Sequence, residues 1–172
     1  GWIGSPLEEA LPVRLDPPQK RQMPKGALVL CIHSVEAPEG VYWGKKVSEA
    51  AVNRLSRLDL AGINEYSWQG GTRWVHPIQP VGDGTAIKRA INALTFGDMP
   101  DFTPSFQLTL NSLKEADAGQ KHMIVISDGD PSMPPASLLQ QFKDAGITVS
   151  TVEVFPHSGA DTSRMEEIAR LT

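Results

Sequence analysis

The segment His122-Met123-Ile124-Val125-Ile126-Ser127-Asp128-Gly129 is the clearest structural signal in this sequence. Its apolar residues follow one another without a polar interruption, which is typical of a strand covered on both faces. Asp128 and Gly129 favour a tight turn directly after that strand. A second apolar run, from Ala27 to Ile32, predicts another central strand. Strands that are buried on both faces belong to parallel sheets, so we expect an α/β protein.

Helical and strand patterns alternate around these two runs. We predict strands at 61–68, 72–78 and 147–154, the first two joined as a hairpin across Gly70-Gly71. Helices are predicted at about 43–58, directly after Gly84-Thr85, around 138–145, and from about residue 165. A further helix is predicted to start near Thr103, with Thr103 as its N-cap and Pro104 at its first position. This order predicts a doubly wound, mainly parallel central sheet with one antiparallel edge strand and helices on both faces. Ligands bind such sheets at the carboxyl ends of the strands, so we single out the loops after residues 32, 81 and 127.

Composition divides the chain and excludes several classes of partner. Residues 1–25 carry five prolines and predict an extended arm, whereas residues 26–172 predict one domain. The net charge of −4 argues against nucleic-acid binding. The longest apolar run is too short to span a bilayer, so we expect no membrane insertion. The chain starts without Met and stops inside a helical pattern, as a piece of a longer protein would.

The motifs and their order resemble the von Willebrand factor A (VWA) domain, over roughly residues 26–172. The resemblance rests on the first apolar strand, on Gly84-Thr85, on Ile124-Val125-Ile126-Ser127-Asp128-Gly129, and on Ala145-Gly146-Ile147-Thr148-Val149-Ser150-Thr151-Val152. The pattern is also similar to bacterial membrane-anchored proteins that combine this domain with a glutamine-amidotransferase-like region. The resemblance implies a Rossmann-like fold that serves as a binding module.

The resemblance also implies a metal-ion-dependent adhesion site that this sequence keeps only in part. The family supplies Asp-x-Ser-x-Ser after the first strand, a Thr from a second loop and an Asp from a third, around Mg²⁺. Thr85 and Asp128 match the last two positions. In the first loop, His33 stands at the Asp position, and Val35 and Ala37 stand at the Ser positions. We therefore expect a degenerate site and no bound metal.

Two alternatives keep a metal ion. Oxygen ligands from Ser34, Glu36, Asp83 or Asp130 would rebuild a Mg²⁺ site around Thr85 and Asp128. His33 and Asp128 are also suitable ligand types for Zn²⁺, although a third ligand is missing because Cys31 lies on the strand. If no metal binds, Thr85 and Asp128 have structural roles: Thr85 would cap its helix, and the Asp128 carboxylate would accept hydrogen bonds from nearby backbone amides.

The expected function is protein binding through the loops at the carboxyl ends of the strands. Exposed aromatic residues anchor many interfaces, and the candidates here are Tyr42-Trp43, Trp68 and Trp74. Alternatives are metal-dependent (Mg²⁺ or Mn²⁺) adhesion or regulation, and a purely structural domain inside a membrane-anchored parent. Ser34 and Ser127 have no nucleophile motif around them, and His76, His122 and His157 follow no recognisable spacing. Gly82-Asp83-Gly84-Thr85 lacks the Lys of a phosphate-binding loop, so we expect no enzyme. The partner and the cellular compartment stay open.

Overall fold

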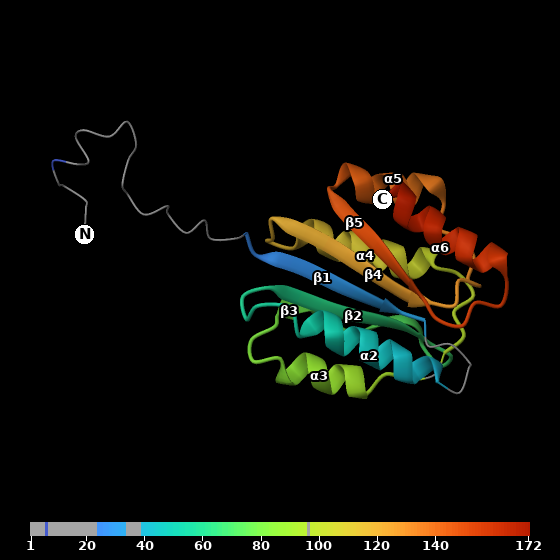
Figure 1. The fold of residues 1–172 in the computed structure, drawn as a ribbon, viewed down its shortest axis with the longest axis horizontal. Coiled ribbons are helices and arrows are strands. Elements are labelled where there is room, and N and C mark those ends of the chain that lie inside the picture. Colours follow the sequence, from blue (N-terminus) through green and yellow to red (C-terminus); the bar gives the residue numbers. More distant parts are fainter. Residues whose placement is uncertain (1–5, 7–23, 34–38, 96) are drawn as a thin grey trace.

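The computed structural model describes residues 6, 24–33, 39–95 and 97–172, which form a single sheet covered by helices (Figure 1). The five strands lie in the order β3-β2-β1-β4-β5. All neighbouring pairs are parallel except β2 and β3, which pair antiparallel at one border of the sheet. The strand bounds are β1 Gly26–Ile32, β2 Leu60–Ser67, β3 Gly71–Pro80, β4 Gln120–Ser127 and β5 Ile147–Glu153. The predicted doubly wound sheet with one antiparallel edge strand is confirmed.

Helices cover both faces, and the alternation of side chains along β1 explains why. Leu28, Leu30 and Ile32 pack on the face covered by α2 and α3, whereas Ala27, Val29 and Cys31 pack on the face covered by the other three helices. Because both sets of side chains are buried, the strand reads as one continuous apolar run. The helix bounds are α2 Gly40–Val52, α3 Thr85–Asn92, α4 Thr103–Glu115, α5 Ala136–Asp144 and α6 Gly159–Leu171.

Two local predictions about helix ends are wrong. The helix predicted at 43–58 ends at Val52, and Leu58, which we counted toward its apolar face, is 76% exposed. Thr103 is the first residue of α4 and not its N-cap, which is Phe102. The backbone N–H of Thr103 donates to the Asp101 carboxylate at 2.8 Å. The predicted arm, residues 1–25, lies mostly outside the described residues.

The hairpin between β2 and β3 determines where the next loop lies. Ser67 pairs with Gly71, and Leu60 pairs with Pro80, so β3 ends beside the start of β2. The Val81 N–H then donates to the Asp59 carbonyl oxygen at 2.9 Å. The loop after residue 81 therefore lies at the amino edge, where the parallel strands begin, and not at the carboxyl edge, where they end.

Candidate functional site

His33 and Asp128 meet at the carboxyl edge because their strands are neighbours. Ile32 of β1 pairs with Ile126 of β4, and each strand places one of the two residues just beyond this pair. Both residues are 2% exposed. His33 Nδ1 lies 3.2 Å from the Asp128 carboxylate and 2.9 Å from Ser127 Oγ. The loops after residues 32 and 127, two of the three that the sequence singled out, therefore meet at this edge.

The neighbours of His33 decide which ring nitrogen carries the proton. Burial on its own would raise the pKa of Asp128, but the hydrogen bond with His33 and their electrostatic attraction lower it to about 2. Asp128 is therefore an ionised carboxylate, which can only accept a hydrogen bond. Ser127 Oγ donates its proton to Asp128 Oδ1 at 3.3 Å, so in its hydrogen bond of 2.9 Å with His33 it accepts, and Nδ1 carries the ring proton. In the neutral ring, Nε2 is left with a free lone pair.

Three more ionisable side chains surround this pair. His33 Nε2 lies 3.9 Å from Asp98 Oδ1, and Nδ1 lies 3.9 Å from Asp130 Oδ1. His157 Nε2 lies 3.6 Å from Asp128 Oδ2. Asp130 was predicted for the site, whereas Asp98 and His157 were missed.

The crowding of carboxylates changes how Asp130 titrates. Burial, followed by repulsion from Asp128 and by their hydrogen bond, raises the pKa of Asp130 to about 6. Its side chain is 38% exposed, so the carboxylate is still open to solvent. A cation at this position would relieve the repulsion between Asp128 and Asp130.

The described structure contains two groups of side chains able to hold a metal ion. One consists of His33, Asp98 and Asp130, and the other of Asp128, Asp130 and His157. In each group the potential ligand atoms lie within 4.8 Å of one another. Both groups share Asp130 and combine one imidazole with two carboxylates, a ligand set that suits first-row transition metals.

Hydrogen bonds between loops hold these residues in place. The Ser132 N–H donates to the Pro100 carbonyl oxygen at 3.0 Å, and the Phe102 N–H donates to the Ser132 carbonyl oxygen at 3.1 Å, which ties the loop of Asp98 to that of Asp130. On the other side, Arg164 Nη1 donates to the Gly129 carbonyl oxygen at 2.7 Å and to Asp161 at 2.9 Å. The acidic loops are therefore supported from α4 and α6.

Asp83 and Thr85 do not belong to this cluster. They follow Val81 and Gly82 at the amino edge, and β1 alone is seven residues long. At about 3.3 Å per residue, the two edges are about 20 Å apart. The prediction that Thr85 and Asp128 share a site is wrong, because the hairpin returns the chain to the opposite edge before α3 starts. Thr85 instead donates its backbone N–H to Asp83 Oδ1 at 2.9 Å.

The first-loop candidates Ser34, Val35, Glu36 and Ala37 lie outside the described residues, so their predicted roles stay predictions.

Exposed aromatic side chains are distributed along the carboxyl edge. Tyr42 and Trp43 lie near the start of α2, Trp68 follows β2, and Phe155 follows β5, with exposed fractions of 53%, 43%, 64% and 45%. We call these four residues the aromatic rim. Trp74, the remaining predicted anchor, is partly buried against the core. In the described part of the chain, the only other large exposed apolar side chain is Leu58.

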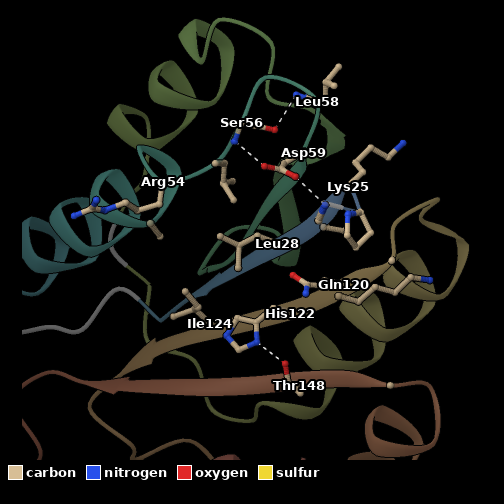
Figure 2. Close-up of a pocket in the computed structure, with 18 residues that line it drawn as sticks. Lys25, Leu28, Arg54, Ser56, Leu58, Asp59, Gln120, His122, Ile124 and Thr148 are labelled. Carbon is tan, nitrogen blue, oxygen red and sulfur yellow. Dashed lines mark hydrogen bonds between the residues drawn. The ribbon is translucent and has the colours of Figure 1, made fainter. Parts of the chain in front are cut away.

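A groove of about 1220 Å³ lies at the opposite edge (Figure 2). Leu28 and Ile124 form part of its apolar floor, and a hydrogen bond of 2.7 Å joins His122 and Thr148 at its side. None of the predicted site residues that the structure describes lines this groove. No helix in the described part of the chain is long and apolar enough to cross a membrane.

Comparisons with known proteins agree with this architecture. A family model described as the von Willebrand factor type A domain matches residues 44–171. Among solved structures, an aerotolerance-related membrane protein from Bacteroides fragilis is 14% identical, with a TM-score of 0.65 over 86% of this chain and 87% of that chain. A von Willebrand factor type A protein from Catenulispora acidiphila is 16% identical, with a TM-score of 0.68 over 87% of this chain and 37% of that chain.

A third similar structure is proximal thread matrix protein 1 from the mussel byssus, described with a metal-ion-dependent adhesion site (MIDAS) motif occupied by zinc. It is 17% identical, with a TM-score of 0.66 over 86% of this chain and 42% of that chain. No curated protein matches the sequence. At these identities the likeness to solved structures concerns the fold.

Proposed function

Because the chain belongs to the von Willebrand factor type A domain family, we propose that it binds a protein partner through the loops at the carboxyl edge of its sheet. Domains of this family are modules for protein interaction or metal-dependent adhesion. The binding proposed here does not use the Mg²⁺ ion of the family's adhesion site. The chain acts as a binding module and catalyses no reaction.

The aromatic rim is the observation that carries this proposal. Large aromatic side chains are costly to leave in water and are enriched at the energetic centres of interfaces. Here all four members of the rim lie at one edge, on both sides of the His33–Asp128 pair. The acidic side chains between them add a negative centre, which favours a partner that presents Lys or Arg beside apolar groups.

A Mg²⁺ ion is a poor fit to the residues at this edge. Mg²⁺ requires a nearly octahedral set of oxygen ligands. Of the two family ligand positions matched by the sequence, Asp128 faces the ring of His33 at 3.2 Å and Thr85 lies at the other edge. The His33 ring and the Ser127 hydroxyl, which donates to Asp128 Oδ1 at 3.3 Å, already occupy the side of this carboxylate that faces the first strand.

The parent protein is proposed to be membrane-anchored. The support is the similarity in fold to the aerotolerance-related membrane protein, over most of both chains. In that setting the domain would present its carboxyl edge to a partner. Metal-dependent binding is the second candidate function, and the grouping of His33, Asp98 and Asp130 favours it. The zinc described in the mussel protein supports a transition metal as the ion.

Affinity capture with matched variants tests the proposal. We would compare the immobilised chain with Trp68→Ala, which removes a rim residue that is 64% exposed, and with Leu58→Ala, which removes a side chain that is 76% exposed at the other edge. Proteins bound by the unmodified chain should be retained by Leu58→Ala and bound about tenfold more weakly by Trp68→Ala. Their recovery should be the same with and without added Mg²⁺. Equal recovery by both variants, or recovery that needs Mg²⁺, would contradict the proposal.

A further inference from the structure

His33 Nε2 is a buried polar atom with no partner in the described structure. The side chain is 1% exposed, and Nε2 makes no hydrogen bond. Buried nitrogen atoms in folded proteins nearly always have a partner, and an unpaired one calls for an explanation. The atom faces Asp98 Oδ1 at 3.9 Å, which is too far for a hydrogen bond but leaves room for an ion between them.

The other ring nitrogen prepares Nε2 to bind a metal. A histidine that ligates a metal usually donates its second N–H to a carboxylate, which fixes the tautomer and makes the ligating nitrogen more basic. Here Nδ1 is hydrogen-bonded to Ser127 Oγ at 2.9 Å, Ser127 Oγ donates in turn to Asp128 Oδ1 at 3.3 Å, and the Asp128 carboxylate lies 3.2 Å from Nδ1. Asp128 is itself held, because the Asp130 N–H donates to its Oδ1 at 3.3 Å.

Two carboxylates complete the arrangement. Asp98 Oδ1 lies 3.9 Å from Nε2 and Asp130 Oδ1 lies 3.9 Å from Nδ1 of the same ring, and the three side chains offer ligand atoms that all lie within 4.8 Å of one another. Tetrahedral zinc with bonds of about 2.0–2.1 Å separates its ligand atoms by about 3.3 Å, so the side chains must close by at most about 1.5 Å. Asp98 and Asp130 are able to do so, because their side chains are 51% and 38% exposed and belong to loops.

We propose that this chain has a transition-metal site of the Zn²⁺ class, formed by His33 Nε2, Asp98 and Asp130. Ser127 and Asp128 orient the imidazole without binding the ion, and the three side chains leave a fourth ligand position. Imidazole nitrogen and carboxylate oxygen are both ligand types that Zn²⁺ accepts, and three protein ligands leave one tetrahedral position for water. The site is independent of the proposed protein binding, since the ion requires only this chain.

The second group, Asp128, Asp130 and His157, is the less suitable of the two. In it Asp128 already accepts hydrogen bonds from Ser127 Oγ and from the Asp130 N–H, each at 3.3 Å. His157 is 65% exposed, so water can satisfy its nitrogens without a metal. Only the first group explains the unpaired, buried Nε2.

A metal titration of the whole chain tests this assignment. Chain freed of metal with a chelator would be titrated with Co²⁺, whose visible absorption reports tetrahedral coordination. Zn²⁺ would then be measured by competition with a chromophoric chelator. We expect one ion per chain, with an affinity in the micromolar range or tighter. Asp98→Asn should weaken Zn²⁺ binding about tenfold or more. His33→Gln should abolish the Co²⁺ spectrum.

Two variants act as controls at other histidines. His157→Gln removes the imidazole of the second group, and His122→Gln removes one at the opposite edge; both should bind Zn²⁺ as the unmodified chain does. Because Asp98 is half exposed, Asp98→Asn should fold normally and decides the result even if His33→Gln does not fold. The proposal is overturned if the chain binds no Zn²⁺, if Asp98→Asn binds it unchanged, or if His157→Gln alone loses it.

Discussion

Cys31 shows how the position of one residue in β1 sets its chemistry. Its side chain is 0% exposed. Burial, opposed only in part by a hydrogen bond with Ser105, raises the pKa of the thiol to about 12. Since only the thiolate is nucleophilic, we expect no reaction with a thiol reagent at about pH 8 in the folded protein and complete reaction in denaturant. Rapid labelling of the folded chain would show that β1 opens readily.

Gly129 shows a steric requirement next to the candidate site. Its φ is +89°, and a Cβ there would lie 2.7 Å from the Asp161 carbonyl oxygen, on the backbone of α6. We predict that Gly129→Ala lowers the free energy of unfolding by about 3 kcal/mol, from the left-handed conformation and the overlap together. Urea unfolding followed by circular dichroism measures the change.

Gly146 provides the matched control for that substitution. Its φ is +65°, yet a Cβ there meets nothing within 4 Å. Gly146→Ala should therefore cost only the backbone part, about 1 kcal/mol. If the two variants lose the same stability, the contact between the loop of Gly129 and α6 does not constrain the site.

At the scale of elements, an ion pair joins the two strands of the hairpin. Glu65 on β2 is fully buried and bonds Arg73 on β3 at 2.7 Å, while Arg73 is 49% exposed. We predict that Arg73→Met lowers the free energy of unfolding by about 1–3 kcal/mol, because it leaves a buried carboxylate without its charged partner. The double variant Glu65→Gln/Arg73→Met should recover part of that loss, as measured by urea unfolding.

An exposed pair on α2 is the control for the hairpin. Lys46 and Glu49 lie 3.5 Å apart with side chains 52% and 38% exposed. Lys46→Met should change the free energy of unfolding by less than about 0.5 kcal/mol. A loss as large as that of Arg73→Met would mean that burial of Glu65 is not the cause.

The elements themselves were predictable from sequence because their patterns are local. A strand buried on both faces needs a continuous apolar run, and β1 and β4 have one. The pairing of these two strands at the centre of the sheet then brings His33 next to Ser127 and Asp128. This part of the site follows from periodicity and from the rules of parallel sheets.

The rest of the site depends on contacts between distant segments. Thr85 was placed at the wrong edge because a Gly-Thr pair can begin a helix at either edge of the sheet. Only the antiparallel direction of β3 shows which edge the chain has reached. Asp98 carries no local signal, and its position depends on two backbone hydrogen bonds between Ser132 and the loop before α4, one donated by Ser132 to Pro100 and one accepted from Phe102. The structure also shows why Gly97 precedes it: a Cβ at that position would overlap the Tyr66 carbonyl oxygen, so the loop packs directly on β2.

For the whole molecule, buried histidines make stability depend on pH. Desolvation lowers the pKa of His76 below its ordinary value of 6.5. The folded chain then holds this proton less tightly than the unfolded chain, so the unfolded state gains stability as the pH falls below 6.5. We predict that His76→Gln reduces the loss of stability between about pH 7 and about pH 5. Urea unfolding at both values measures it, and an unchanged difference would remove His76 as a cause.

The response of the whole domain to metal ions separates a hard-ion site from the proposed zinc site. A ligand that binds only the folded state stabilises it by about 2.7 kcal/mol at a hundredfold excess over its Kd. For a domain of this size, that corresponds to a rise in Tm of about 5–10 °C. We predict such a rise with Zn²⁺ and none with millimolar Mg²⁺, measured by calorimetry on the chelator-treated chain.

Asp98→Asn distinguishes this effect from non-specific binding of zinc. The substitution leaves the other surface carboxylates and the exposed His157 in place. A specific site requires that the Zn²⁺-induced rise in Tm fall to about half or less in this variant, because tenfold weaker binding lowers the stabilisation from about 2.7 to about 1.4 kcal/mol. Its metal-free Tm should stay the same, because the Asp98 side chain is 51% exposed. An equal rise in both proteins would mean that zinc stabilises the fold from elsewhere. A rise with Mg²⁺ would instead mean that oxygen ligands at this edge rebuild the family's adhesion site despite the histidine.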